Sequence, residues 1–511
     1  MIDFTPLTRP YFARLYSRAA SVATPDDTEK VQRAVLRHLL ATARHTAIGR
    51  EHGFSSLDSY EAFAGAVPTV EYEDMRPLVM RMVQGERDVL WPGVCRRFAQ
   101  SSGTSGGKSK YIPVTSASLR QNHYAGSAIA VATYLHNNPS SRIFSGKSFI
   151  LGGSFANELA DVPAGVRVGD LSASLIDNIT PFAELFRVPS KKIALMENWE
   201  RKVEDLAHST AKESITNISG VPSWFHTILR HILRITGKKN IHQVWPGLEV
   251  FFHGGIAFEP YREQYRAITD PARMHYHENY NASEGFFATQ ESPDGKGMRL
   301  LTDIGTFYEF IPLDSLGNSA PKAVPAWQVE KGRVYALAIT SCNGLWRYII
   351  GDTVRIESTK PLLITIAGRT NSFINAFGEE LMVWNADTAI ARACAKTGAS
   401  VANYTAAPVY ASCGTKGHHQ WLIEWAVAPP QGTDEFAEVL DRELQAVNSD
   451  YQAKRSADIF LAIPEVTTVA TGTFDRWLAS TGKLGGQRKI PRLANDRRFA
   501  DPILTFSSVK S

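Results

Sequence analysis

The sequence predicts an α/β protein with a large N-terminal domain, in which mixed sheets are flanked by helices, and a smaller C-terminal α/β domain. Three observations lead to this fold class. The chain has 511 residues, 44% of them hydrophobic, and this length suits two or three domains at about 150 residues each. From about Val94 onward, extended runs and glycine-rich turns alternate with helical patterns. The pattern changes again after Gly368 and Arg369, which predicts domains at residues 1–370 and 371–511.

The N-terminal part begins with helical sequence. Residues 24–27 read TPDD, a capping-box start with proline at the first helical position. Further along, periodicity predicts a helix at 115–135 and strands at 96–100, 111–114, 248–252, 298–301, 305–311, 333–339 and 353–356. In the smaller domain it predicts strands at 409–412, 420–426 and 458–463 and a helix at 434–448. His418 and His419, next to Gly417, are expected in a solvated loop.

Composition and charge argue against several classes of partner. The chain carries 55 basic and 51 acidic residues, a net charge of +4, without a long basic run, so we expect no nucleic-acid partner and no membrane association. No segment approaches the roughly 18 consecutive apolar residues of a membrane span, and the N-terminus lacks a signal pattern. The four cysteines lie far apart and are expected to be reduced. We expect a cytoplasmic monomer with small-molecule partners.

A segment rich in glycine and hydroxyl groups carries the strongest chemical signal. Residues 100–110 read QSSGTSGGKSK, so backbone N–H groups, hydroxyls and two lysines are available to phosphate oxygens. The segment is not a Walker-type P-loop, because its spacing is one residue too short and residues 111–114 are extended where that motif needs a helix. We expect instead a phosphate-binding loop between two strands of a hairpin. The competing interpretation is a solvated turn of serines and glycines.

Three further motifs follow along the chain. Residues 251–256 form an apolar strand that ends in Gly254 and Gly255, a turn where backbone can approach a planar ligand. Residues 280–284, YNASE, place an aromatic ring and a carboxylate four residues apart, so the ring can stack on a purine while the carboxylate reaches a metal ion. Asp352 follows Gly351 at the end of an apolar run, a suitable acceptor for a ribose diol.

In this order, the motifs resemble those of the adenylate-forming superfamily and, within it, the Gretchen Hagen (auxin-responsive promoter) acyl-acid-amido synthetases. SSGTSGGKSK resembles the phosphate loop of that family, HGGIAFEP its glycine turn, YNASE its adenine and magnesium motif and RYIIGD its ribose motif. NSDY at 448–451 with Arg455, and GQRKIPR at 486–492, resemble its C-terminal signature. The resemblance covers nearly the whole chain.

The resemblance implies an ATP-dependent ligase whose C-terminal domain is mobile. Such an enzyme adenylates a small carboxylic acid with ATP and Mg²⁺, then transfers the acyl group to an amine, here expected to be an amino acid. It implies that Glu284 binds Mg²⁺, that Asp352 binds the ribose and that Lys489 is the catalytic lysine of adenylation. The other ATP-binding residues that it implies are Ser101, Ser102, Thr104, Lys108, Gly254, Gly255, Tyr280, Asn281, Ser283 and Arg369.

Several alternatives stay open. Lys483, in an STGK segment similar to that of acyl-CoA ligases, competes with Lys489 for the role of adenylation lysine. Glu379 and Glu380 stand where plant relatives carry an Asp-Lys pair, which leaves the details of the hinge open. An acyl-CoA ligase that uses the same adenylation step and a nucleotide-binding protein without catalysis are the alternative functions.

The residues that bind the acid are expected in two segments. Arg120 and Tyr124, on the helix after the phosphate loop, should line its pocket together with the region 175–186. His253, beside the glycine turn, either orients the carboxylate of the acid or is a hydrogen-bonded structural histidine. The sequence names neither the acid nor the amine.

Overall fold

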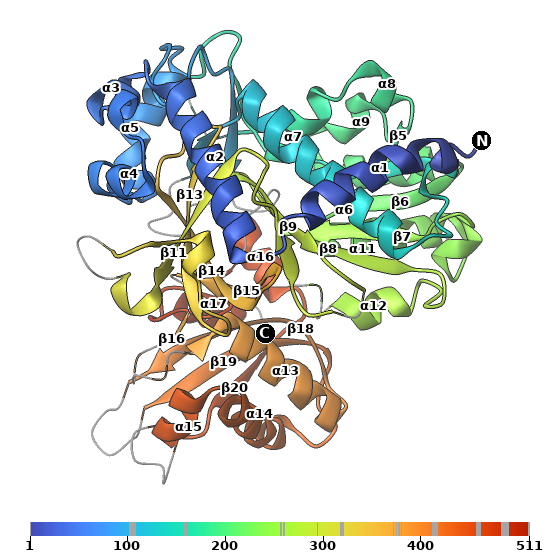
Figure 1. Ribbon diagram of the computed structural model, residues 1–511. Helices are drawn as coiled ribbons and strands as arrows, with labels where there is room; N and C mark the ends of the chain where they lie inside the picture. Colours follow the sequence, from blue (N-terminus) through green and yellow to red (C-terminus); the bar gives the residue numbers. More distant parts are fainter. Residues whose placement is uncertain are drawn as a thin grey trace. The chain divides into compact units, whose positions relative to one another are not determined.

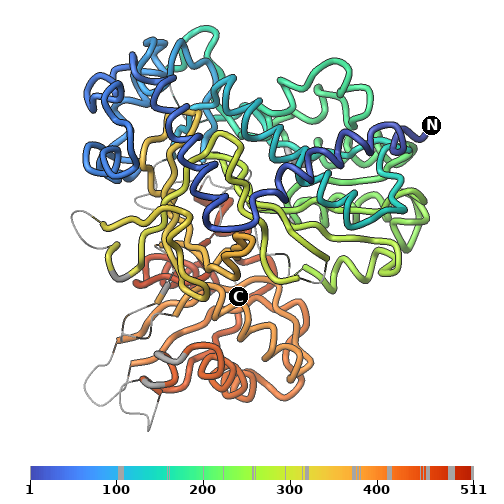
Figure 2. Tube along the Cα trace, in the orientation of Figure 1, coloured from blue at the N-terminus to red at the C-terminus, as the bar shows by residue number. Residues whose placement is uncertain are grey.

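The computed structural model describes residues 2–101, 109–157, 159, 161–255, 258, 261–293, 295–316, 321–370, 373–374, 376, 379, 381–410, 417–455, 461–481 and 490–508. The chain divides into two units, which can be followed in Figures 1 and 2. The large unit comprises Met1–Ile350 and Val354–Thr365, and the small unit comprises Gly351–Thr353 and Ile366–Ser511. The mixed α/β class expected from the sequence is confirmed, while the division at residues 370 and 371 stays a prediction.

The helices of the large unit come from its whole length. They are α1 (Thr5–Ala20), α2 (Pro25–Ala43), α3 (Ala47–Glu51), α4 (Tyr60–Ala66), α5 (Tyr72–Val83), α6 (Tyr124–Asn137), α7 (Leu171–Asp177), α8 (Pro181–Glu184), α9 (Lys191–Ala194), α10 (Trp199–Thr210), α11 (Pro222–Thr236) and α12 (Arg262–Arg266). A π-helical turn at Ser118–His123 leads directly into α6. The predicted capping box of α2 is confirmed, since Thr24 and Asp27 each accept the other's backbone N–H.

The strands of the large unit form two sheets. Their bounds are β1 (Arg97–Ser101), β2 (Lys110–Pro113), β3 (Lys147–Ile150), β4 (Arg167–Gly169), β5 (Arg187–Val188), β6 (Ile215–Gly220), β7 (Val250–Gly254), β8 (His275–Ala282), β9 (Gly285–Gln290), β10 (Met298–Leu300), β11 (Thr306–Pro312), β12 (Val324–Pro325), β13 (Val334–Ser341), β14 (Tyr348–Thr359) and β15 (Leu362–Arg369). One sheet has the order β2-β1-β4 and the other β12-β11-β13-β14-β15-β10-β9-β8-β7-β6-β3-β5. Residues 351–353 of β14 belong to the small unit.

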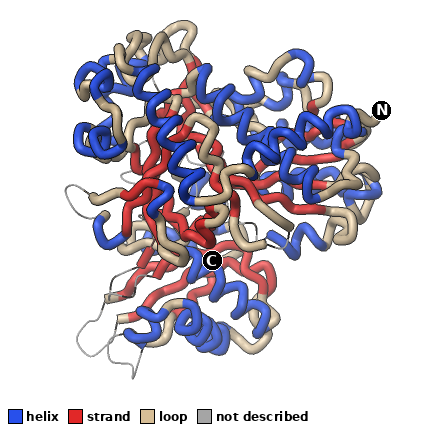
Figure 3. Tube along the Cα trace, in the orientation of Figure 1, coloured by secondary structure: helices blue, strands red, loops and turns tan. Residues whose placement is uncertain are grey.

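The parallel half of the larger sheet explains how the core is filled. Strands β3, β5, β6, β7 and β8 pair in parallel, and helices lie on both sides of these strands in Figure 3. On β7, Phe251 packs in the cluster that contains Phe225 of α11, whereas the next residue, Phe252, packs with Tyr134 of α6. Successive side chains of a strand point to opposite faces, so an unbroken apolar run is what a strand covered on both faces requires.

The small unit is built from helices packed on a three-stranded sheet. Its elements are β16 (Phe373–Ile374), β17 (Leu381–Met382), α13 (Val383–Thr397), β18 (Ser400–Val409), β19 (His418–Val427), α14 (Thr433–Val447), α15 (Ser449–Arg455), β20 (Glu465–Val469), α16 (Thr473–Ser480) and α17 (Ala500–Ser508). The sheet order is β18-β19-β20, antiparallel and then parallel. Ile390 of α13 and Leu440 of α14 share a buried cluster with Trp421 of β19.

Three expectations for the small unit differ from its described residues. Strand β18 ends at Val409, so it lies earlier in the chain than the strand expected at 409–412, of which residues 411 and 412 lie outside the described residues. The Ala-Ala-Pro sequence of β18 has the low strand propensity that concealed it. The strand expected at 458–463 does not extend over its described part, 461–463; β20 begins at Glu465. His419 lies within β19 and is 1% exposed, because it is paired with a buried carboxylate and does not need water.

Within the described parts of the chain, no helix combines the length and the apolar character needed to cross a membrane.

Candidate active site

The segment predicted to bind phosphate begins and ends on the hairpin of β1 and β2, here called the phosphate hairpin, as expected. Strands β1 and β2 pair antiparallel, and Ser101 lies opposite Lys110. The side-chain amide of Gln100 donates to Ser109 Oγ at 3.2 Å, which ties the two strands beside the loop. Strand β4 extends this sheet in parallel with β1. Ser102, Thr104 and Lys108 lie outside the described residues, so Ser101 is the one predicted phosphate-binding residue of this loop whose position is described.

The glycine turn lies against the segment that carries the predicted adenine motif. Strand β7 is parallel to β8, and Gly254 lies opposite Asn279. A Cβ atom on Gly254 would stand 2.4 Å from the Asn279 carbonyl oxygen and 2.5 Å from Asn281 Oδ1, and Gly255 has φ +77°. Both positions therefore require glycine. The structure thus brings together two motifs that were separate in the sequence.

The turn between β8 and β9 presents residues of contrasting exposure. Tyr280 is 3% exposed and packs edge-to-face on Phe287, with 5.0 Å between ring centroids, so its stacking on adenine stays a prediction. Asn281 is exposed. Ser283 is buried, and within the described part of the chain its Oγ has no hydrogen-bond partner. A buried hydroxyl without a partner is rare in a folded protein and is a candidate contact for a ligand.

Glu284 is joined to the base of the phosphate hairpin. The Tyr348 hydroxyl donates to Glu284 Oε1 at 3.5 Å, and Lys110 Nζ donates to the same hydroxyl at 3.2 Å. The Asn343 side chain also donates to the backbone carbonyl of Glu284 at 3.1 Å. The predicted metal carboxylate and the predicted phosphate segment therefore meet within the large unit. Sequence reasoning counted Lys110 among the lysines available to phosphate but missed Tyr348, which stands inside the RYIIGD motif, and the contact between the two.

These residues fit a nucleotide and a divalent cation. The glycine cradle leaves backbone uncovered for a planar base, and the Ser283 hydroxyl is available as a polar contact. A carboxylate oxygen such as that of Glu284 is the donor that Mg²⁺ prefers, and this ion usually takes one or two protein carboxylates and completes its shell with phosphate oxygens and water. No group of three or more His, Cys, Asp or Glu side chains among the described residues is arranged to hold a metal by itself.

His253 is buried beside a separate cavity. Its ring stacks on Phe258 at 4.3 Å between centroids, and its Nδ1 has no hydrogen-bond partner among the residues that the structure describes. Burial lowers the pKa of His253 to about 3, so the imidazole is neutral and cannot attract a carboxylate as a cation.

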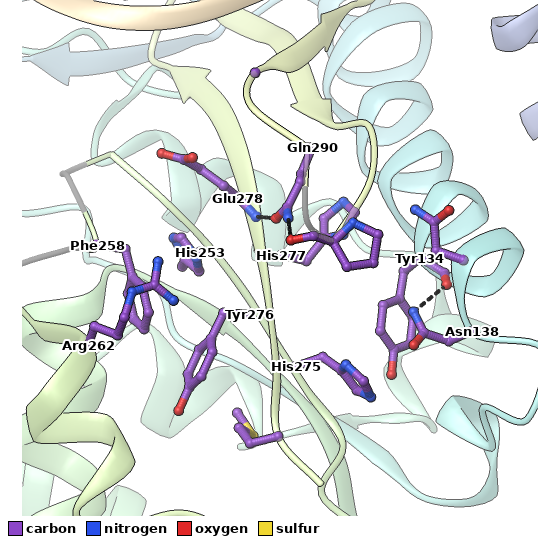
Figure 4. Close-up of a pocket in the computed structure, with 15 residues that line it drawn as sticks. Tyr134, Asn138, His253, Phe258, Arg262, His275, Tyr276, His277, Glu278 and Gln290 are labelled. Atoms are coloured by element: carbon purple, nitrogen blue, oxygen red, sulfur yellow. Dashed lines mark hydrogen bonds between the residues drawn. The ribbon is translucent and has the colours of Figure 1, made fainter. Parts of the chain in front are cut away.

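The cavity beside His253 has a volume of about 440 Å³ and lies around the first half of β8. Figure 4 shows Phe258 and Arg262 on one side of the strand, and Tyr134, Asn138 and His275 on the other. Its described lining includes no other residue predicted to bind ATP, metal or acid. The described residues that are predicted to bind the nucleotide therefore do not line this cavity.

The two segments expected to bind the acid are in contact. The Tyr124 hydroxyl donates to the backbone carbonyl of Leu175, on α7, at 2.8 Å, and burial raises the pKa of Tyr124 to about 12. Arg120 is exposed on the π-helical turn before α6. Such turns widen a helix by one residue and are frequent at functional sites. The roles of Arg120 and Tyr124 toward an acid stay predictions.

In the small unit, Asp352 and Arg369 form an ion pair. Arg369 Nε lies 3.1 Å from Asp352 Oδ1, and the Asp352 side chain is 12% exposed while that of Arg369 is 42% exposed. The two residues stand on β14 and β15. The structure thus joins two residues for which the sequence predicted contacts with the same ribose or phosphate.

The predicted adenylation lysines and most of the hinge lie outside the described residues. This applies to Lys483, Lys489, Gly378 and Glu380. The chain is described again from Ile490, and there the carbonyls of Pro491 and Arg492 accept hydrogen bonds from Thr405 Oγ1 at 2.7 Å and from the Ala406 N–H at 2.8 Å. The segment that follows Lys489 is therefore fixed to β18.

Two other predicted features of the small unit are buried in it. Tyr451 and Arg455 of the C-terminal signature both donate to Asp441, at 2.8 and 2.7 Å, and all three side chains are buried. Glu379, from the predicted hinge, is bonded to His419 at 2.8 Å, and both side chains are fully buried. These residues hold the unit together.

A two-unit α/β chain with a phosphate hairpin, a glycine turn and a carboxylate joined to the hairpin has the fold of adenylate-forming enzymes. The chain resembles solved structures of 2-hydroxyisobutyryl-CoA ligase in complex with 2-HIB-AMP, with a TM-score of 0.59 and 15% identity over 95% of this chain and 94% of that one. It resembles the GH3.15 acyl acid amido synthetase more strongly, with a TM-score of 0.76 and 17% identity over 97% and 95% of the two chains.

The chain belongs to the GH3 family. Residues 22–274 match the GH3 family N-terminal domain, residues 299–369 the central domain and residues 384–498 the C-terminal domain. A relative named as a probable indole-3-acetic acid-amido synthetase GH3.1, from Oryza sativa subsp. japonica, is 24% identical over 91% of this chain and 87% of its own length. The family resemblance inferred from the motifs is thereby confirmed.

Proposed function

We propose that this protein uses ATP to adenylate a small carboxylic acid and then transfers the acyl group to the amine of an amino acid, forming an amide. The junction of the phosphate hairpin, Lys110, Tyr348 and Glu284 in one unit carries the proposal. Membership of the GH3 family supports it, as does the amido-synthetase activity named for its relatives.

The chemistry divides into two transfers. In the first, a carboxylate oxygen of the acid attacks the α-phosphorus, the new O–P bond forms and pyrophosphate leaves with the electrons of the broken P–O bond. In the second, the amine attacks the activated carbonyl, the C–N bond forms and the amine loses a proton, while the bond between the acyl carbon and the phosphate oxygen breaks and AMP leaves with its electrons. The protein contributes mainly by positioning the reactants and stabilising developing negative charge.

Each predicted residue takes a role in the first transfer. Ser101, Ser102, Thr104 and Lys108 would bind the β- and γ-phosphates. Glu284 would hold Mg²⁺, which when bound neutralises charge on the phosphate oxygens. Asp352 and Arg369 would bind the ribose. The residues proposed to bind the adenine base are Gly254, Gly255, Tyr280, Asn281 and Ser283. The residues proposed to bind the carboxylic acid are Arg120, Tyr124 and His253.

We assign the adenylation lysine to Lys489, with Lys483 as its rival. One site must serve a phosphoryl transfer and then an amine attack, so the small unit is proposed to move between them and to carry Lys489 in for the first and out for the second. The place of Lys489 in GQRKIPR, which resembles the C-terminal signature of the family, supports this choice, as does the compact charge that a lysine ammonium offers to a transferring phosphoryl group.

A matrix of carboxylic acids and amino acids tests the proposal. Purified protein with ATP and Mg²⁺ should release pyrophosphate only with an accepted acid, and mass spectrometry should find the amide when an amino acid is added. A parallel series with coenzyme A tests the alternative acyl-CoA ligase, for which a thioester would replace the amide. The proposed transfer would be contradicted if no acid in the matrix caused release of pyrophosphate. It would also be contradicted if none of the amino acids gave an amide.

A further inference from the structure

The turn between β13 and β14 holds Glu284 at two points. From this turn, Asn343 donates to the Glu284 backbone carbonyl at 3.1 Å, and Tyr348 donates to Glu284 Oε1 at 3.5 Å. Asn343 is oriented in turn by a hydrogen bond from Ser341 Oγ to its side-chain oxygen. These partners are buried, with Tyr348 fully so. One turn therefore fixes both the backbone and the carboxylate of the residue assigned to the metal.

Tyr348 also connects that carboxylate to a cation. Lys110 Nζ donates to the Tyr348 hydroxyl and lies 5.7 Å from the centroid of the Tyr348 ring and 5.8 Å from that of Tyr72. The donors run in one direction, from ammonium to phenol to carboxylate, so each hydrogen bond polarises the next. Since Lys110 faces Ser101 across the hairpin, this relay begins where the phosphate loop closes.

The backbone just before Tyr348 has a conformation that is uncommon for a residue with a side chain. Arg347 has φ +44°, in the left-handed region. Its guanidinium pairs with buried Glu309 at 2.8 Å and donates to the carbonyls of Ala64 at 2.8 Å and Val67 at 2.7 Å. On either side of Tyr348, Val70 N–H donates to the Arg347 carbonyl and Ile349 N–H donates to the Val70 carbonyl. Strained backbone of this kind persists where surrounding contacts impose it, often at functional sites.

We propose that Tyr348 is a positioning residue for adenylation, which orients the Glu284 carboxylate for Mg²⁺ and couples it to Lys110 at the base of the phosphate hairpin. The inference rests on the proposed function, and specifically on Glu284 as the metal ligand. Tyr348 acts through Glu284, so its hydroxyl should matter for the part of ATP binding that depends on Mg²⁺. Arg347 and Glu309 keep Tyr348 in place by holding the turn.

Calorimetric titration of the protein with ATP, once in the presence of MgCl₂ and once in the presence of EDTA, measures the Mg²⁺-dependent part of ATP binding directly. The ratio of the two dissociation constants is the gain in affinity due to the metal. Loss of one hydrogen bond to a charged group should reduce that gain by about tenfold or more in Tyr348→Phe, with metal-free binding unchanged. Tyr308→Phe is the matched control: Tyr308 is fully buried on β11 of the same sheet, and its hydroxyl donates to the Leu301 carbonyl.

The outcomes separate this inference from the proposed function. A wild-type ratio in Tyr348→Phe, or an equal loss of affinity with and without metal, overturns the positioning role. A wild-type ratio in Glu284→Gln instead removes Glu284 as the metal ligand, and the inference falls with its premise. If Tyr348→Phe does not fold, as judged by circular dichroism, Lys110→Met interrupts the same relay from its half-buried end, and an unchanged ratio there overturns the proposal.

Discussion

Glu284 is the residue whose loss should separate binding from chemistry. Glu284→Ala removes a carboxylate that the structure joins to the phosphate hairpin, so charge on the phosphates should go uncompensated in the transition state. We expect acid-dependent exchange of pyrophosphate into ATP to fall by about a hundredfold or more, since metal stabilisation is worth several kcal/mol. Circular dichroism should be unchanged, and the exposed Glu263→Ala is the control. Undiminished exchange in Glu284→Ala would refute the assignment.

Asp352 should act on the sugar of the nucleotide. A hydrogen bond to a charged acceptor contributes about 1.5 to 3 kcal/mol, so Asp352→Ala should bind ATP more weakly and distinguish it less from its 2′- and 3′-deoxy analogues. Asp352→Asn keeps a hydrogen-bond acceptor, so its affinity for ATP and its discrimination against the deoxy analogues should lie between those of wild type and Asp352→Ala. Because Asp352 is paired with Arg369, Arg369→Ala is needed to separate loss of the carboxylate from release of its partner. Equal preference in wild type and Asp352→Ala would assign Asp352 another role.

A buried histidine predicts how stability depends on pH. Burial lowers the pKa of His277 to about 3, and its ring is bonded to Thr289 Oγ1 at 2.8 Å. Below about pH 6.5 the unfolded chain binds a proton at this residue that the folded chain does not, so stability is complete above pH 6.5 and falls with decreasing pH by about 1.4 kcal/mol per unit. His277→Gln should therefore lose less stability than wild type between pH 7.5 and 5.5.

Thermal or urea unfolding at those two pH values measures the difference. The exposed His38→Gln is the matched control and should follow wild type. If His277→Gln also follows wild type, the histidine is not the group that takes up the proton.

Local motifs of the site were predictable from the sequence, whereas its long-range contacts were not. Tyr280 and Glu284 are only four positions apart, so one short motif holds both. The extended sequences before and after SSGTSGGKSK sufficed to predict a hairpin. Lys110 and Tyr348, by contrast, are 238 positions apart in the chain. Their contact depends on how β2 and β14 are placed by the fold, and no periodicity records that.

Among the elements, the strands with strong propensity and clear boundaries were predicted near their true positions. For the other strands, the predicted residues differ from those in the structure. The strand predicted at 248–252 is β7, at Val250–Gly254, and the predicted capping box starts α2. The position of β18 was not predicted correctly, because alanines and Pro408 occupy the C-terminal half of this strand. His419 was misjudged because its buried partner, Glu379, comes from 40 residues earlier. Tertiary partners decided these cases against local propensity.

The capping box of α2 can be tested by one substitution. Thr24→Ala removes the side chain that accepts the Asp27 N–H at 3.2 Å, and loss of an N-cap costs about 0.5 to 2 kcal/mol. We expect a lower midpoint of thermal unfolding. Thr42→Ala, an exposed residue of the same helix whose hydroxyl donates to the His38 carbonyl, should change it less. A cost at Thr42 as large as that at Thr24 would mean that the cap does not determine the stability of α2.

On the scale of the whole molecule, the two half-reactions should respond differently to one substitution. Lys489→Ala should suppress formation of the acyl-adenylate, because a compact positive charge near the transferring phosphoryl group is lost. It should still convert a chemically supplied acyl-adenylate to the amide. Single-turnover assays of each half-reaction measure this, with Lys483→Ala alongside. Loss of both half-reactions would indicate a folding defect, and a selective loss in Lys483→Ala alone would move the assignment to Lys483.

The three residues of β14 that belong to the small unit limit how the protein can be cut apart. The backbone crosses from one unit to the other before Gly351, after Thr353 and again before Ile366. A fragment that begins at Ile366 therefore leaves Asp352 behind, together with the Gly351 carbonyl that accepts the Thr370 N–H at 2.8 Å. Conversely, a fragment that ends at Ile350 loses residues 354–365 of the large unit. No single proteolytic cut or gene truncation releases either unit intact. The two units therefore have to be inherited, expressed and engineered together as one chain.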